Sequence, residues 1–439
     1  MFSATAATAA IGFLVSPIMS RLYAPAAYGL FAVFNGLVSN VTMISTLAYP
    51  TAFLLPRLTK RFHALVHLSL LLAMGSFGLI TLILVLFKGP LLRALQVEVL
   101  GNWVYAVPAT AFVYNLMLIM NAWYLRTKEF RKQASINIVT SLSGRALTLG
   151  AGVLLHGSVT GLLLGEVFSK LAGTGIVFFS GINRQIGALI HSYSWARIRA
   201  VAYEYREYPL YVAPGGYLNT LAFQLPTLLL TSSFGATAVG LYAFSTSLLE
   251  LPISLMGSAI SPVFLQKATE TYEQEPARLP ELCLSLYYKL LYLGLVPFGI
   301  ITVYGDWIFR IVFGARWEGA GVFTSYLGYY YVFRLASYAT SPIYAVLRRQ
   351  RLALWGVILL VLARVGSLII GVYAHSINLG MMLFGISSLA VTFGVDMNIL
   401  NLLGLSVWPI ALRSVSLVLL TLVVLYAMRL GLQQLLGWH

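Results

Sequence analysis

Long apolar stretches constrain this chain of 439 residues more than any other feature of its sequence. A helix needs about 20 apolar residues to cross a bilayer, and thirteen such stretches follow one another along the chain. They lie near 2–20, 28–55, 64–87, 103–125, 134–155, 159–180, 208–233, 237–264, 284–304, 320–346, 353–374, 378–404 and 412–432. None alternates apolar and polar residues as a barrel strand does. The sequence therefore predicts an all-α polytopic membrane protein with about 12–13 transmembrane helices.

The composition excludes a soluble enzyme, a nucleic-acid-binding module and a disordered chain. Hydrophobic residues make up 59% of the sequence and charged residues 9%, whereas a soluble domain carries about 25% charged residues. So little polar surface cannot keep a protein of this size dispersed in water. The single cysteine, Cys283, excludes a disulfide framework and a cysteine-based metal site. We therefore predict neither a metal nor a cofactor.

The formal net charge of +15 reflects membrane topology. Lysine and arginine are enriched in the cytoplasmic connections of membrane proteins, and here they concentrate in alternate connections. The connections predicted to be cytoplasmic contain Arg57, Lys60, Arg61, Arg126, Lys128, Arg131, Lys132, Arg184, Arg197, Arg199, Arg206, Lys267, Arg278, Arg348, Arg349, Arg351 and Arg413. The basic excess is thus a sign of orientation, and it does not indicate a nucleic-acid partner.

An internal repeat divides the chain into two halves. PAAYGLFAVF (25–34) resembles ATAVGLYAFS (236–245). In the same order, GRALTLGAG (144–152) resembles ARVGSLIIG (363–371). Each half holds six apolar stretches, so a pseudo-two-fold axis along the membrane normal is expected to relate two six-helix bundles, as in many transporters. We predict an N-terminal six-helix bundle at 1–180, a cytoplasmic linker at 181–207, a C-terminal six-helix bundle at 208–404 and an additional C-terminal helix at 405–439.

Ionisable residues within the apolar stretches are the first candidates for function. A charge costs about 2.5–3.5 kcal/mol to insert, so it usually faces a bundle interior or a watery cavity. The basic ones are Arg145, Lys170, Lys289, Arg334 and Arg364, and the acidic ones are Glu166, Glu250 and Asp396. The surplus of cations suits an anionic substrate, and arginine offers a fork that matches phosphate. Arg145 and Arg364, at equivalent repeat positions, lead the substrate-binding candidates; the alternative is that each bonds backbone carbonyls or snorkels to an interface.

The three acids are candidates for binding a coupling ion. Glu166 lies four residues before Lys170, so an ion pair on one helix face is the structural alternative. Asp396 is either a protonatable group or a hydrogen-bonded polar contact. Glu250 precedes a proline, where a broken helix would leave carbonyl groups for a cation.

The segment SPIMSRLYAPAAYGLF (16–31) resembles the opening of Wzx-type polysaccharide and O-antigen flippases, which belong to the multidrug/oligosaccharidyl-lipid/polysaccharide exporter superfamily. In that family a first helix ends in a run that leads into the second helix. The matching residues here are Pro17, Arg21, Leu22, Pro25 and Gly29.

This resemblance implies a transporter and not an enzyme. Such proteins move undecaprenyl-pyrophosphate-linked oligosaccharide across the bacterial inner membrane, for the biosynthesis of O-antigen, capsule or exopolysaccharide. The implied mechanism is alternating access of two bundles. The implied partners are the lipid-linked oligosaccharide, membrane lipids, and the polysaccharide polymerase and chain-length proteins.

Two alternatives stay open at this point. An ion-coupled exporter of small cationic drugs on the same fold would need carboxylates in the N-terminal bundle, where the apolar stretches offer Glu166. A membrane glycan polymerase or ligase would need charged clusters on sizeable outer loops, and the outer connection near 305–319 carries several polar groups. ATP hydrolysis is not expected, because the sequence has no Gly-rich phosphate loop.

Overall fold

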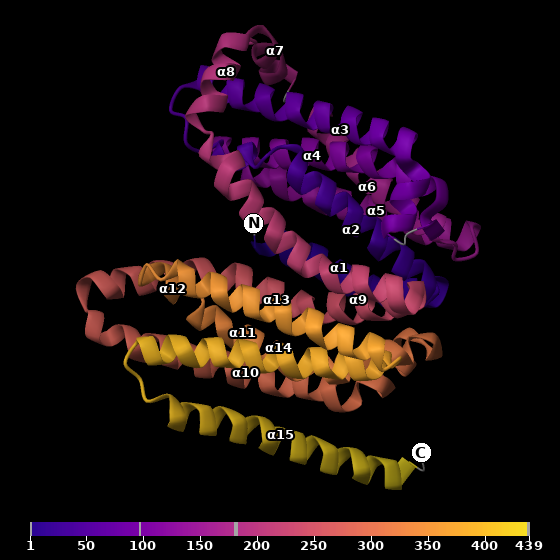
Figure 1. Ribbon diagram of the computed structural model, residues 1–439, viewed down its shortest axis with the longest axis vertical. Coiled ribbons are helices and arrows are strands. Elements are labelled where there is room, and N and C mark those ends of the chain that lie inside the picture. The colour runs from indigo at the N-terminus through magenta and orange to yellow at the C-terminus, as the bar shows by residue number, and fades with distance from the viewer. Residues whose placement is uncertain (1, 96–97, 180–182, 437–439) are drawn as a thin grey trace. The chain divides into compact units, whose positions relative to one another are not determined.

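The computed structural model describes residues 2–95, 98–179 and 183–436. Within these ranges the chain is built of helices and contains no strand (Figure 1). The long helices are α1 (Phe2–Leu22), α2 (Pro25–Ser45), α3 (Thr59–Leu95), α4 (Ala106–Thr127), α5 (Phe130–Leu154), α6 (Val159–Phe179), α9 (Ala213–Gln274), α10 (Leu279–Ile308), α11 (Glu318–Thr340), α13 (Gln350–Tyr373), α14 (Ile377–Leu402) and α15 (Val407–Leu436). The short ones are η1 (Tyr49–Ala52), η2 (Glu98–Tyr105), α7 (Asn183–His191), α8 (Trp195–Glu204), η3 (Tyr208–Val212), η4 (Pro276–Arg278), η5 (Phe309–Phe313), η6 (Ala315–Trp317) and α12 (Ile343–Val346).

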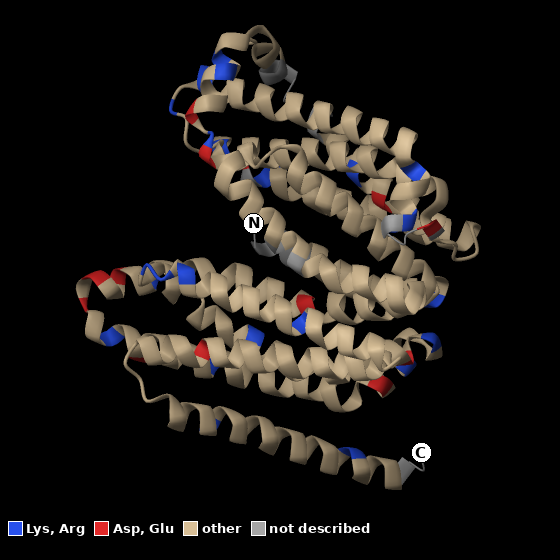
Figure 2. Cartoon of the chain, viewed as in Figure 1, with Lys and Arg blue, Asp and Glu red and all other residues tan. Residues whose placement is uncertain are grey.

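The predicted all-α polytopic membrane fold is confirmed. Among the described residues, eight helical segments are long and apolar enough to cross a membrane. Two predicted stretches, 208–233 and 237–264, join into the single long helix α9, which Gly235 interrupts with a φ of 78°. Glycine adopts this left-handed backbone without steric cost, so α9 has two arms. Charged residues gather near helix ends, and the helix middles are mostly uncharged (Figure 2).

One predicted stretch, 28–55, is not a single helix. Helix α2 ends at Ser45, ahead of Leu47 and Ala48, which have φ values of 49° and 59°. Non-glycine residues rarely adopt this conformation, and it cannot continue an α-helix. The chain then forms η1 before α3 begins, so the apolar run bends where a straight helix was expected.

The chain forms two compact units, Ser3–Gly240 and Leu241–His439. The first, unit 1, includes the first arm of α9, because that arm packs on α2: a methyl group on Gly36 would lie 3.1 Å from Oε1 of Gln224. The second, unit 2, contains the second arm of α9 from Leu241 onward and the helices that follow. The predicted domain bounds stay a prediction, and residues 180–182 and 437–439, at two of those bounds, lie outside the described residues.

Helices α2 and α9 cross with their backbones in contact. A methyl group on Gly29 would overlap the carbonyl oxygen of Ala236 and lie 3.0 Å from the backbone nitrogen of Gly240. A methyl group on Gly240 would overlap the carbonyl oxygen of Pro25 and lie 2.9 Å from the nitrogen of Gly29. Small residues four positions apart on both helices permit such an approach. The two glycines that match in the sequence repeat thus contact each other.

The segment predicted as a cytoplasmic linker contains helices α7 and α8, and it folds back on α3. Arg61 pairs with Glu204 at 3.1 Å, and Nδ1 of His63 lies 2.9 Å from Oγ of Ser192. Trp195, at the start of α8, is 64% exposed. An exposed tryptophan beside basic residues is typical of a helix at a membrane surface.

Candidate functional site

A cavity of about 670 Å³ lies in unit 1 between α2, η1, α4, the start of α5 and the first arm of α9. We call it the unit 1 cavity. It is lined by Ser39, Thr42, Met43, Thr46, Ala48, Pro50, Thr51, Leu54, Tyr114, Leu118, Asn121, Ala122, Leu125, Gln133, Thr220, Phe223 and Gln224. This lining contains hydroxyl and amide groups but no charged side chain.

Helical spacing explains why these residues share a cavity. Ser39 and Thr42 lie three residues apart on α2, so they share one face of that helix, and Thr46 follows directly after its last residue. On the first arm of α9, Thr220 and Gln224 are four residues apart. This spacing of hydroxyl and amide residues within apolar stretches is the sequence pattern that could have indicated the cavity. The charged candidates did not indicate this cavity, because its lining is uncharged.

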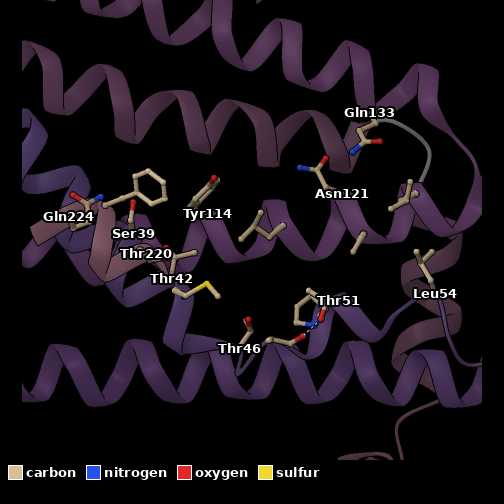
Figure 3. Close-up of a pocket in the computed structure, with 17 residues that line it drawn as sticks. Ser39, Thr42, Thr46, Thr51, Leu54, Tyr114, Asn121, Gln133, Thr220 and Gln224 are labelled. Carbon is tan, nitrogen blue, oxygen red and sulfur yellow. Dashed lines mark hydrogen bonds between the residues drawn. The ribbon is translucent and has the colours of Figure 1, made fainter. Parts of the chain in front are cut away.

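The polar groups form an elongated row. Gln224 and Ser39 lie toward one end of the unit 1 cavity, and Asn121 and Gln133 lie toward the other (Figure 3). Oγ1 of Thr42 and Oε1 of Gln133 are buried without a hydrogen-bond partner among the described residues. A buried polar atom without a partner costs about 1–3 kcal/mol. Both atoms belong to residues that line the unit 1 cavity.

Lys170 lies beside the wall of the unit 1 cavity. Its Nζ is 4.6 Å from the centroid of the Tyr114 ring, and it pairs with Glu166 at 3.1 Å. Arg145 on α5 packs against α1, where its side chain occupies the space that a side chain at Gly12 would fill. Nε of Arg145 also lies 3.4 Å from Oγ of Ser141. Neither Lys170 nor Arg145 is a lining residue of the cavity.

In unit 2, Arg364 is enclosed by uncharged groups. It is 8% exposed, and it donates to Oγ of Ser388 at 3.0 Å and to the hydroxyl of Tyr330 at 2.7 Å. Its guanidinium also lies 5.0 Å from the centroid of the Phe384 ring. The sequence repeat predicts equivalent positions for Arg145 and Arg364, but the contacts of the two side chains differ.

The other two basic candidates of unit 2 have different environments. Nε of Arg334 lies 3.4 Å from Oε1 of Glu250, so α11 and the second arm of α9 share an ion pair. Lys289 is exposed on α10. The structure thus brings Arg334 and Glu250 together and keeps Lys289 at the surface of the unit.

Asp396 is buried on α14, with 1% of its surface exposed. It accepts hydrogen bonds from Ser337 at 2.9 Å and from Thr340 at 2.5 Å. No basic group among the described residues forms an ion pair with it. The described residues also contain no group of three or more side chains that would hold a metal ion.

The motif residues near the start of the chain have mainly packing roles. Pro17 lies inside α1, and its carbonyl accepts a hydrogen bond from Ser20 at 2.9 Å. Arg21 is exposed in the last turn of α1. Pro25 and Gly29 are buried and form the crossing with α9.

Comparison with known families identifies the chain. The model of the family described as "Polysaccharide biosynthesis protein" matches residues 18–321. The chain belongs to this family. The predicted resemblance to polysaccharide flippases is thereby confirmed.

Two curated relatives of this polysaccharide biosynthesis protein have named roles. The amylovoran biosynthesis protein AmsL of Erwinia amylovora is 21% identical over 248 residues, which cover 55% of this chain and 60% of the relative. The succinoglycan biosynthesis transport protein ExoT of Rhizobium meliloti is 20% identical over 332 residues, which cover 71% of this chain and 61% of the relative. The alignments thus span about three fifths of the relatives' lengths.

Solved structures share the fold at low sequence identity. An inward-facing multidrug resistance transporter of the MATE family superposes with a TM-score of 0.68 at 16% identity, covering 95% of both chains. The lipid II flippase MurJ superposes with a TM-score of 0.63 at 11% identity, covering 99% of both chains. These similarities confirm the predicted two-bundle fold.

Proposed function

We propose that this polysaccharide biosynthesis protein is a flippase for a lipid-linked oligosaccharide. Its substrate is an undecaprenyl-pyrophosphate-linked oligosaccharide, which it moves across the bacterial inner membrane by alternating access. The product serves the biosynthesis of O-antigen, capsule or exopolysaccharide. The named roles of the two curated relatives, in amylovoran and succinoglycan biosynthesis, support this class of substrate.

The unit 1 cavity carries the proposal. Sugars present many uncharged hydroxyl groups, which donate and accept hydrogen bonds, and the cavity offers hydroxyl and amide groups without a charge. Pyranose rings also pack on aromatic faces, which Tyr114 and Phe223 provide in the lining. The elongated row of polar groups fits successive sugar units of a short chain.

The charged candidates have supporting roles in this proposal. Lys170 beside the cavity, and Arg145 on the neighbouring helix, attract the pyrophosphate in unit 1. Arg334 and Arg364 act as anion-binding groups of unit 2, with Lys289 as a further cation on α10. The acids Glu166, Glu250 and Asp396 stay candidates for the coupling ion. The polymerase and chain-length proteins are the expected partners.

A multidrug-type function is less well supported than glycan transport. A cavity for cationic drugs would be expected to contain a carboxylate, because an opposite charge stabilises a cation removed from water. The lining of the unit 1 cavity has none. Glu166, the acid on the neighbouring α6, is paired with Lys170.

Complementation of a flippase-null strain tests the proposal. The double variant Asn121→Leu/Gln224→Leu removes two amides from the unit 1 cavity and keeps similar side-chain volume. We expect polysaccharide at the cell surface to fall by at least about tenfold, while the membrane level of the protein is unchanged. The matched control, Asn401→Leu/Gln266→Leu, replaces two exposed amides and should complement fully. Full complementation by the cavity variant would overturn the proposal.

A further inference from the structure

A second cavity, of about 480 Å³, lies in unit 2 between α13 and α14. We call it the α13–α14 groove. Its lining is mostly apolar and includes Trp355 and Leu359, which are 66% and 54% exposed. Gly394 on α14 leaves room within it, because a methyl group there would have no neighbour within 4 Å. The groove therefore offers an apolar chain a continuous surface along two membrane helices.

One end of the α13–α14 groove is strongly basic. Arg348, Arg349 and Arg351 lie at the start of α13, just before the first groove residue on that helix, Leu352. All three arginines are exposed, and none forms an ion pair with a described carboxylate. Their charge is therefore not neutralised within the described part of the chain. An anion is the complementary ligand.

The same end of the groove carries an amide group next to its apolar lining. A short connection joins the end of α13 to the start of α14, so the two helices run antiparallel. The last turn of α14 therefore lies at the same end of the groove as the first turn of α13. Asn398 lines the groove near this end of α14 and is exposed there. Amides at this depth match the ester groups of a glycerolipid, which accept hydrogen bonds. Charge, amide and apolar surface thus follow one another in the order of phosphate, ester and acyl chain.

The predicted topology places the basic end on the cytoplasmic side, where anionic phospholipids attract clusters of lysine and arginine. We propose that the α13–α14 groove binds one anionic glycerophospholipid of the cytoplasmic leaflet. Its phosphate contacts Arg348, Arg349 and Arg351, and one acyl chain lies along Trp355 and Gly394. This site is separate from the unit 1 cavity, and it does not depend on which substrate that cavity takes.

Tryptophan quenching measures occupancy of the groove directly. The purified full-length protein is placed in phosphatidylcholine nanodiscs that contain the same small fraction of brominated phosphatidylglycerol or brominated phosphatidylcholine. The signal of Trp355 is the difference between the wild-type protein and Trp355→Phe. We expect brominated phosphatidylglycerol to quench this signal about fivefold more effectively, because each basic residue near the site favours an anionic lipid. Equal quenching by the two lipids would overturn the proposal.

Two variant sets separate this site from general surface attraction. Arg348→Gln/Arg349→Gln/Arg351→Gln should abolish the preference for phosphatidylglycerol. An equal loss of charge in another connection, Lys128→Gln/Arg131→Gln/Lys132→Gln, should preserve it. Loss of the preference in this control would overturn the proposal in favour of a non-specific basic surface.

A variant that fills the groove is an independent test, because it leaves every arginine in place. Gly394→Leu fills the α13–α14 groove and should reduce quenching of Trp355 by about half or more. Gly75→Leu, at an open and exposed position on α3, should not change it. Unchanged quenching in Gly394→Leu would contradict the proposed acyl-chain site. Displacement of brominated phosphatidylglycerol by an equimolar amount of a polyprenyl phosphate would likewise overturn it, since the groove would then hold the tail of a polyprenyl lipid.

Discussion

The glycine crossing between α2 and α9 allows the sharpest prediction about stability. In Gly29→Ala the new methyl group would lie 2.7 Å from the carbonyl carbon of Ala236 and 3.0 Å from the nitrogen of Gly240, where ordinary contacts begin at 3.4 Å. These neighbours are backbone atoms, so no side chain can rotate away. The two helices must therefore move apart by on the order of 1 Å, and overpacking of this kind costs about 1–3 kcal/mol.

The reciprocal geometry of the crossing predicts non-additivity. Gly240→Ala meets the carbonyl group and nitrogen of the opposite helix in the same way, so it should lower the free energy of unfolding by a similar amount. Once one methyl group has separated the helices, the second fits with less strain. The double variant should then be less destabilised than the sum of the two single variants.

Unfolding of the detergent-solubilised protein by increasing denaturant, followed by helical circular dichroism, measures these free energies. Gly75→Ala on α3 is the control, because a methyl group there has no neighbour within 4 Å. A Gly29→Ala protein as stable as the control would refute the contact. Additive effects of Gly29→Ala and Gly240→Ala would refute the argument that both glycines serve one crossing.

Three further predictions concern charged residues within the helices. Asp396→Leu should destabilise the protein by about 1–3 kcal/mol because two hydroxyl donors lose their acceptor; Asp396→Asn, which keeps an acceptor, should be milder in the same unfolding assay. Tyr330→Phe should cost about 1.5–3 kcal/mol by removing the 2.7 Å hydrogen bond to buried Arg364, and unchanged stability would favour a purely substrate-binding role for this arginine. Glu166→Gln should lower the melting temperature by leaving Lys170 without its partner, and replacing Lys170 by methionine in that variant should restore it.

Periodicity and hydropathy were sufficient to predict the helices, but they did not predict where the helices are interrupted. The apolar runs at 208–233 and 237–264 each predict a crossing, and the structure joins them through Gly235. The run at 28–55 predicts one helix, but it bends after Ser45 because Leu47 and Ala48 adopt a left-handed backbone. Local composition does not reveal such a bend, since an apolar run has the same composition whether it forms one helix or includes a turn.

The surroundings of the charged candidates depend on contacts that are distant in sequence. The repeat gives Arg145 and Arg364 the same place in their helices, but Arg364 is enclosed by Tyr330 from α11 and Phe384 from α14. The pairing of Glu166 with Lys170 is visible in the sequence because both residues lie on one helix. The unit 1 cavity combines four separate segments of the chain, so its shape was not predictable from any one of them.

The central claim is that the unit 1 cavity takes the sugar part of a lipid-linked oligosaccharide. Its most direct test is the rate at which purified protein in proteoliposomes moves undecaprenyl-pyrophosphate-linked oligosaccharide between leaflets, measured by protection of the sugar from an added glycosidase. We predict that Asn121→Leu/Gln224→Leu slows this movement at least about tenfold, while Asn401→Leu/Gln266→Leu moves the lipid at the wild-type rate. Equal rates for the wild-type protein and the cavity variant would contradict the claim.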